Sequence, residues 1–253
     1  MLNWVLKGIQ TGIKTTSYPP ALETAPGISP GRPKEREWGE DGSTHSLVEI
    51  CPTGALKETD KGISVDYGRC VHCYRCKRQT PTPMLWQEGF EWAEAPNKSE
   101  VIQSPFARSL HIRIVDAGAC GACLSEIKQL NNPYYNIHRL GFFITPTPRS
   151  ADVLLVAGPL TDHVRTALQK TYEAMPTPKR ILAVGACALS GGVFGPSFAA
   201  GSGIADLLPV DVEVPGCPPP PLALIHALLV VAGRSQPNRI KSSPEAYERE
   251  DKR

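Results

Sequence analysis

Hydrophobic residues in the second half of the chain fall into two alternating patterns. Runs of about five mostly apolar residues, typical of buried strands, alternate with stretches in which apolar residues repeat every three or four positions, typical of helices. This alternation predicts an α/β fold with an open, mostly parallel sheet and helices on both faces. The strands are expected at 110–115, 141–145, 153–157, 180–184 and 210–214, and the helices at 124–130, 162–174 and 222–232.

The beginning of the chain has a helical pattern of its own. Over residues 1–16 the apolar side chains repeat at helical spacing, whereas Lys7 and Lys14 lie away from this stripe. An amphipathic helix of this kind either packs on its own domain or docks onto a membrane partner, and we assign it as a docking helix. Its apolar positions are Leu2, Val5, Leu6, Ile9 and Ile13.

Composition narrows the classes of function. The formal net charge is +2 and no dense basic segment is present, which argues against nucleic-acid binding. No apolar run reaches the roughly 18 residues that a membrane span needs, and the N-terminus lacks the pattern of a secretory signal. We therefore expect a cytoplasmic protein, in which cysteines bind metals or do chemistry more often than they form structural disulfides.

The first four of the eight cysteines follow a ferredoxin-type spacing. Bacterial ferredoxins with two clusters repeat the run Cys-x-x-Cys-x-x-Cys-x-x-x-Cys-Pro, and the last cysteine of each run binds the cluster of the other run. One ligand set of that template is complete here, which predicts a ferredoxin-like domain reduced to one 4Fe-4S cluster. The complete set is Cys51, Cys70, Cys73 and Cys76, and the positions of the other set, all without a thiol, are Asp41, Thr44, Leu47 and Thr80.

A zinc site is the alternative for these four cysteines. Zinc also binds four thiolates, usually from two closely spaced cysteine pairs. Three cysteines at a spacing of three residues, together with a distant Cys-Pro, suit a cuboidal iron–sulfur cluster better. His72 lies inside the cysteine loop, where charge or hydrogen bonding from its ring would tune the cluster.

The other four cysteines are spread over the predicted α/β domain. Cys120, Cys187 and Cys217 each follow a short hydrophobic run, which places their thiols at the carboxyl ends of strands, where open sheets bind ligands. Cys120 and Cys123 also open a predicted helix, whose free N–H groups can hydrogen-bond cluster sulfurs. A thioredoxin-like dithiol is the alternative for this pair, although it leaves Cys187 and Cys217 unexplained. We predict a second 4Fe-4S cluster on Cys120, Cys123, Cys187 and Cys217.

The motifs around the second group of cysteines resemble a known family. They resemble the small subunit of membrane-bound, energy-converting NiFe hydrogenases of the formate hydrogenlyase type, in a superfamily that includes the 20 kDa subunit of complex I. Complex I subunits carry two adjacent cysteines at the first position, whereas the spaced pair here resembles the hydrogenase branch. The motifs are Asp116-Ala-Gly-Ala-Cys120-Gly-Ala-Cys123 with Glu126, the segment 148–161, Gly185-Ala-Cys187-Ala-Leu-Ser-Gly191-Gly192 and Pro215-Gly216-Cys217-Pro218-Pro219.

The first part of the chain resembles a second subunit of the same assemblies. Residues 1 to about 90, including the helical start and the stretch Thr15–Pro19, resemble their ferredoxin-type subunit, which is here fused to the small-subunit segment. We therefore divide the chain into a docking helix at 1–16, a ferredoxin-like domain with linkers at 17–104, a hydrogenase small-subunit-like domain at 105–233 and a disordered tail at 234–253.

The resemblance implies a fold and a function. It implies a flavodoxin-like fold for residues 105–233 and makes the cluster of Cys120, Cys123, Cys187 and Cys217 the proximal one, beside a large catalytic subunit. The chain would then relay electrons to or from a NiFe hydrogenase large subunit without bond chemistry of its own. Its partners would be that large subunit, membrane-arm subunits and a further electron-carrier protein, in a hetero-oligomer at the cytoplasmic face of the membrane.

Two other functions remain open on the sequence alone. One is a relay subunit of a complex I-like or hydrogenase-related respiratory complex whose large subunit has no NiFe centre. The other, from a different class, is a thiol–disulfide redox protein that uses Cys120 and Cys123. Iron and acid-labile sulfide would separate the thiol–disulfide protein from either relay.

Overall fold

The largest element of the fold is a five-stranded sheet in the second half of the chain. The computed structural model describes residues 2–23, 30–37, 45–79, 83–96, 105–106 and 108–237. The sheet strands lie in the spatial order β10-β9-β8-β6-β7, and every neighbouring pair is parallel. Numbered within the sheet, this is the order 2-1-3-4-5 of flavodoxin-like folds. The strands are β6 (Leu110–Asp116), β7 (Phe142–Ile144), β8 (Val153–Ala157), β9 (Arg180–Val184) and β10 (Val212–Val214).

The predicted open α/β fold is therefore confirmed, and the hydrophobic runs explain why. The central strand β8 is buried along its whole length, as expected for a parallel strand covered on both faces. Its side chains alternate between two cores, so that Leu155 packs on one face of the sheet and Leu154 on the other. The three helices predicted for this domain are also present, with ends that differ from the prediction by no more than two residues.

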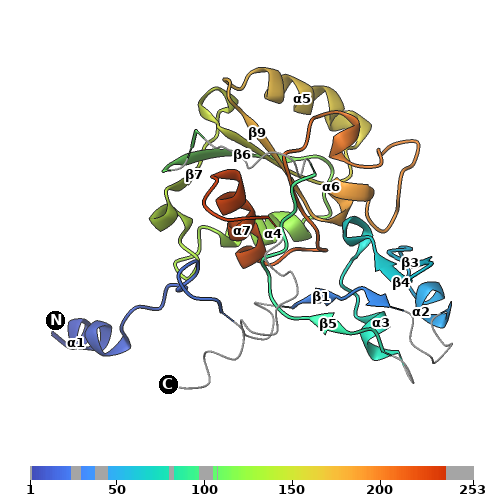
Figure 1. Cartoon of the computed structure of the whole chain (residues 1–253). Coiled ribbons are helices and arrows are strands. Elements are labelled where there is room, and N and C mark those ends of the chain that lie inside the picture. The colour runs from blue at the N-terminus through green and yellow to red at the C-terminus, as the bar shows by residue number, and fades with distance from the viewer. Residues whose placement is uncertain are drawn as a thin grey trace.

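Helices cover both faces of the sheet (Figure 1). One face carries α4 (Ala122–Gln129) and α7 (Pro221–Val231), and every residue of α7 is buried. The opposite face carries α5 (Asp162–Glu173), whose Leu168 is fully buried, and the short α6 (Ala186–Ser190). The sequence did not predict α6, because five residues are too few to show a helical period. Short 3-10 turns complete this part: η2 (Ile137–Leu140), η3 (Pro148–Ser150) and η4 (Ile204–Asp206).

The first part of the chain contains small antiparallel sheets and short helices. Its own core consists of Leu47, Leu56, Ile63, Val65 and Met84. Leu47 is one of the positions that lack a thiol, whereas Asp41, Thr44 and Thr80 lie outside the described residues. The ferredoxin-like assignment of this part stays a prediction. Its elements are β1 (Arg32–Pro33) paired with β5 (Trp86–Gln87), the sheet of β2 (Arg36–Glu37), β4 (Gly62–Val65) and β3 (Leu56–Thr59), the helices α2 (His45–Glu49) and α3 (Arg75–Arg78), and the turn η1 (Tyr67–Arg69).

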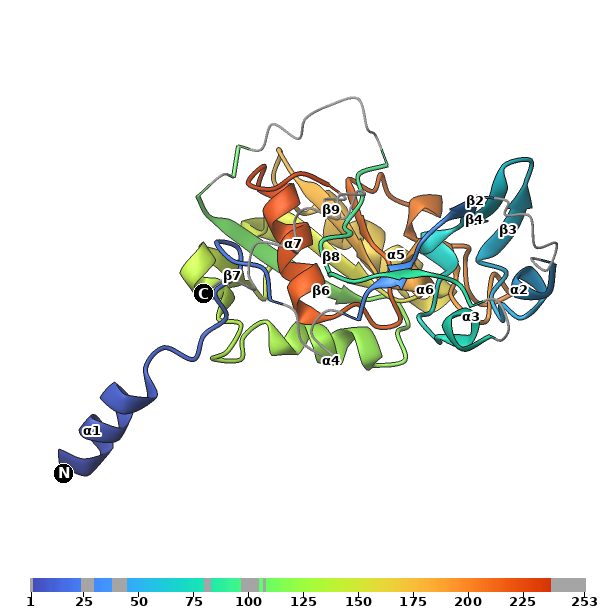
Figure 2. The ribbon, with the colours of Figure 1, turned by 60° about the horizontal axis from the view of Figure 1, so that its bottom comes forward.

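The N-terminal helix stands apart from the rest of the molecule. Figures 1 and 2 show α1 (Leu2–Thr11) projecting away from the sheet, and the described side chains from Asn3 to Lys14 are all exposed. The helix ends before the expected residue 16, because Gly12 follows it in the left-handed conformation that commonly ends helices. Among the helices of the described chain, none is long and apolar enough to cross a membrane.

The stretch that follows α1 is anchored to the parallel sheet. Tyr18 is buried and packs in the same core as Phe90, Trp92 and the residues of α7. Its hydroxyl donates a hydrogen bond to Glu91 Oε1 at 2.9 Å. Segments that the sequence assigns to the N-terminal part thus help to build the larger core, and the division at residue 104 stays a prediction. Of the predicted tail, residues 238–253 lie outside the described chain.

Candidate metal centres

Three loops at the carboxyl edge of the parallel sheet carry the second group of cysteines. Cys120 and Cys123 follow β6, Cys187 lies at the start of α6 after β9, and Cys217 follows β10. Cys123 is buried, Cys187 and Cys217 are partly buried, and Cys120 is exposed. The loop after β6 lies at the switch point of the sheet, where open α/β sheets bind ligands.

The thiols of this group lie close enough for their charges to interact. Burial raises the pKa of Cys123 to about 12, and the charges of Cys217, Cys187 and Cys120 raise it as well. Burial also raises the pKa of Cys187 and of Cys217, with a contribution from Cys120 in both cases. Four thiolates at one such site would repel one another, and a cationic metal centre would remove this repulsion by binding them.

Two glycines bring the backbone directly against these sulfurs. A Cβ atom at Gly185 would lie 2.6 Å from Cys123 Sγ, and one at Gly192 would lie 2.5 Å from Cys187 Sγ. Real Cβ atoms do not approach sulfur so closely, and both glycines have positive φ, so a larger residue fits neither position. The backbone of this site is therefore shaped around the thiols.

The first group of cysteines lines a single pocket. All four cysteines border the same pocket, together with Trp86. Cys51 lies just after α2 and Cys70 follows η1. Cys73 lies in the loop before α3, and Cys76 lies within α3. Burial raises the pKa of Cys70 to about 12, and the charges of Cys76, Cys51 and Cys73 raise it as well. The structure thus brings together the four cysteines that the ferredoxin template selects.

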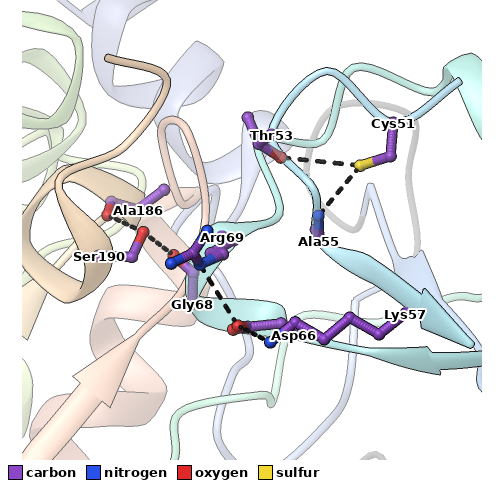
Figure 3. Close-up of polar contacts among 9 residues, drawn as sticks. All are labelled: Cys51, Thr53, Ala55, Lys57, Asp66, Gly68, Arg69, Ala186 and Ser190. Atoms are coloured by element: carbon purple, nitrogen blue, oxygen red, sulfur yellow. Dashed lines mark hydrogen bonds and ion pairs between the residues drawn. The ribbon is translucent and has the colours of Figure 1, made fainter. Parts of the chain in front are cut away.

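Hydrogen-bond donors lie close to the sulfur of Cys51 (Figure 3). The Ala55 amide donates to Cys51 Sγ at 3.3 Å, and Thr53 Oγ1 lies 3.7 Å from the same sulfur. Burial raises the pKa of Cys51, but hydrogen bonds from Thr53, Ala55 and Leu56 together outweigh it and lower the pKa below its usual range. Hydrogen bonds to sulfur are one of the means by which proteins set the potential of an iron–sulfur cluster.

Among the residues that the structure describes, no three side chains of His, Cys, Asp or Glu meet closely enough to hold one metal ion.

The two cysteine groups are neighbours in space. The turn η1, which leads into Cys70, packs on α6, which carries Cys187; Ser190 Oγ donates to Gly68 O at 3.0 Å and also lies 3.1 Å from Ala186 O (Figure 3). A second contact joins Trp92 to the loop of Cys217, since Trp92 Nε1 donates to Pro215 O at 2.9 Å.

A cavity of about 260 Å³ lies between the two groups. His72 and Tyr74 line it from the first cysteine loop, and Cys217 and Glu126 line it from the second site, where burial raises the pKa of Glu126. Trp92 also borders the cavity. Sequence reasoning missed Trp92, because it lies outside every cysteine motif and meets its partner 123 residues away.

Comparisons with known proteins place the chain in a family. Residues 120–231 match the family model of the NADH ubiquinone oxidoreductase 20 kDa subunit. An uncharacterised protein of Methanocaldococcus jannaschii is 42% identical over 141 residues, which cover 54% of this chain and 95% of that protein. Formate hydrogenlyase subunit 7 of Escherichia coli K12 is 33% identical over 153 residues, or 60% of this chain and 58% of that subunit.

A solved structure is also similar. A chain in the structure of the membrane-bound sulfane sulfur reductase, an archaeal respiratory membrane complex, is 30% identical, with a TM-score of 0.45 over 56% of this chain and 80% of that chain. The matched family segment contains Cys120, Cys123, Cys187 and Cys217, so the resemblance drawn from their motifs is confirmed, while the likeness of the N-terminal part to a ferredoxin-type subunit stays a prediction. With a relative 42% identical over nearly its whole length and a family model matching residues 120–231, the chain belongs to the family of the 20 kDa subunit of NADH–ubiquinone oxidoreductase.

Proposed function

We propose that this chain is an electron-transfer subunit that holds two 4Fe-4S clusters. The observation that supports this most strongly is the gathering of all eight cysteines into two neighbouring groups of four. The first cluster would be held by Cys51, Cys70, Cys73 and Cys76, and the second by Cys120, Cys123, Cys187 and Cys217. A cluster bound in this way supplies one-electron transfer at a potential that hydrogen bonds and burial adjust.

The surroundings of both groups fit such clusters. Buried thiols with raised pKa values become thiolates when they bind a metal centre, which replaces their protons. The amide of Ala55 supplies a hydrogen bond to sulfur at the first site, and Gly185 and Gly192 leave room beside the sulfurs of the second. A dithiol function of Cys120 and Cys123 gives no role to Cys187 and Cys217, whose thiols interact with that pair.

The relatives support a place in a multi-subunit complex. The matched relative is subunit 7 of formate hydrogenlyase, and the matched family is the 20 kDa subunit of NADH ubiquinone oxidoreductase, so both are parts of larger complexes. By analogy, we place the second site against a hydrogenase-like large subunit, α1 against membrane-arm subunits, and the first site toward a further electron-carrier protein, at the cytoplasmic face of the membrane. Nickel in the isolated complex would assign a NiFe large subunit, and a nickel-free complex would assign the related respiratory relay.

Metal analysis of the chain tests the proposal. Anaerobically prepared protein should contain about eight irons and as many acid-labile sulfides, because two cubane clusters hold four of each. Cys73→Ala should remove roughly half of the iron and leave the second site loaded, since Cys73 belongs only to the first group. Zinc in place of iron, or eight titratable thiols with no iron after reconstitution, would contradict the proposal.

A further inference from the structure

Two aromatic residues connect the first cysteine loop with the loop of Cys217. His72 lies between Cys70 and Cys73, and its ring stacks on Trp92 with a centroid distance of 5.3 Å and an interplanar angle of 24°. Trp92 is fully buried and donates its indole N–H to Pro215 O, two residues before Cys217. His72, Trp92 and Cys217 also border the same cavity. The stack is therefore a packed connection alongside the cavity.

His72 occupies this place at a cost to stability. Its φ is +50°, in the left-handed region that side chains other than glycine rarely adopt. Both of its ring nitrogens are buried, and neither makes a hydrogen bond of normal geometry in the described chain, although the backbone of Cys70 lies beside the ring. Unpartnered buried polar atoms and strained backbone both destabilise a fold, and they concentrate at functional sites. An apolar residue in a relaxed loop would fill the same space at lower cost, so packing alone does not account for His72.

We propose that the stacked pair of His72 and Trp92 is the path that couples the two cysteine sites electronically. This inference rests on the proposed function. Electron tunnelling falls off more slowly through packed atoms than across a gap, and the pair supplies packed rings beside a cavity that would otherwise separate the sites. The electron that leaves one site arrives at the other, with no proton transferred and no bond formed or broken.

The hydrogen bond between Ser190 and Gly68 is the competing path and provides the matched control. It also joins the two sites, through η1 and α6, but contains no aromatic ring. The variants are His72→Leu, which keeps most of the volume but removes the aromatic ring, His72→Phe, which restores a ring, and Ser190→Ala. Each is prepared as the full chain, and iron content and the two midpoint potentials are measured first.

The deciding measurement is the rate of electron exchange between the sites. A laser flash on a dissolved ruthenium polypyridyl complex with a sacrificial amine donor delivers one electron per chain, and the first-order phase that follows reports its passage between the sites. His72→Leu should slow this phase severalfold at unchanged iron content, and by more than any measured change in the two midpoint potentials accounts for. His72→Phe should recover most of the rate, and Ser190→Ala should match the wild type. A wild-type rate in His72→Leu, or slowing by Ser190→Ala alone, would overturn the inference.

A substitution of Trp92 tests the same path if His72→Leu loses iron. Trp92→Phe keeps a ring beside His72 but removes the bond to Pro215 O, so it should slow the first-order phase with both sites loaded. An unchanged rate in this variant would overturn the inference. Absence of iron from the wild-type chain would instead contradict the proposed function, so the two failures are distinguishable.

Discussion

Gly192 and Cys187 make one of the closest backbone approaches at the second site. In Gly192→Ala the new Cβ would lie 2.5 Å from Cys187 Sγ and 3.1 Å from its Cα, so the sulfur must move. We expect this variant to lose the second cluster, which is roughly half of the iron, while the first site keeps its own. Iron and labile sulfide per chain, together with the electron paramagnetic resonance of the reduced protein, measure this.

Gly195→Ala is the control for Gly192→Ala. Gly195 has nearly the same φ, +67° against +69°, but a Cβ there has no atom within 4 Å. Both variants therefore carry the same left-handed strain of roughly 1–2 kcal/mol, and only one displaces a thiol. Equal iron in the two variants would mean that contact with Cys187 is irrelevant to the site.

The sequence predicts some residues of the candidate sites and not others. The spacing of the cysteines predicts the two groups, because ligand motifs are local and strand ends converge at one edge of an open sheet. The Ala55 amide that donates to Cys51 Sγ lies in a turn. The side chains of this turn do not predict its backbone geometry, so the sequence did not predict this hydrogen bond. Trp92 and Ser190 meet partners more than a hundred residues away, and nothing in their local sequence indicates those contacts.

Two strands of the parallel sheet were predicted with the bounds that the structure shows, because they are buried on both faces. The strands β8 and β9 begin and end where the apolar runs do, since both lie inside the sheet and both their faces meet helices. The strands of the first part, several of only two residues, are too short to show alternation, and their pairing depends on turns. Hydrophobic periodicity therefore predicts the scaffold of the second site far better than that of the first.

The helix α1 has exposed apolar side chains that can be changed without disturbing the rest of the fold. Leu6 and Ile9 are 48% and 74% exposed, so Leu6→Asp with Ile9→Asp should leave iron content and melting temperature unchanged. The apolar stripe is expected to contact membrane-arm subunits, and two charges there should release the chain into the fraction that does not sediment with membranes. Fractionation of cells that express the variant measures its release from membranes. Iron analysis and thermal unfolding of the purified chain measure the other two quantities.

A charge-matched variant of the same helix controls for added charge. Asn3→Asp with Gln10→Asp adds two carboxylates at polar, exposed positions of α1 and should leave the chain with the membranes. Loss of iron in the Leu6 and Ile9 variant would mean that α1 packs on its own domain in the assembled protein. Release by both variants would mean that charge rather than the apolar stripe decides attachment.

At the scale of the whole molecule, the two parts of the chain are joined along one side of the sheet. Glu94 and Glu213 exchange backbone hydrogen bonds of 2.8 and 2.7 Å, which add residue 94 beside the edge strand β10. Arg32 pairs with Glu94 at 3.2 Å and lies over the ring of Tyr67. Together with the contacts of Ser190 and Trp92, these bonds hold the two cysteine groups at a fixed separation, which an electron relay requires.

The same joint makes stability depend on pH through Glu213. Burial raises the pKa of Glu213 above its ordinary value of 4.5, and the negative charges of Glu94 and Asp66 raise it as well. Because the folded state binds the proton more tightly than the unfolded state, the protonated side chain stabilises the fold in acid, and this contribution is lost as pH rises through the folded pKa. Near neutral pH, ionised Glu213 therefore destabilises the joint relative to a neutral side chain.

Glu213→Gln should accordingly raise the melting temperature near neutral pH. The gain should shrink as the pH falls toward 4.5 and below, because the folded wild-type carboxyl takes up its proton at a higher pH than an ordinary glutamate. Glu173→Gln is the control, because Glu173 pairs with Lys170 at 2.8 Å and has a lowered pKa, so its replacement should give no gain near neutral pH. Thermal unfolding of the full chain across this pH range measures both. A gain for Glu213→Gln that grows in acid, or one that Glu173→Gln reproduces, would show that the ionisation of buried Glu213 does not destabilise the joint.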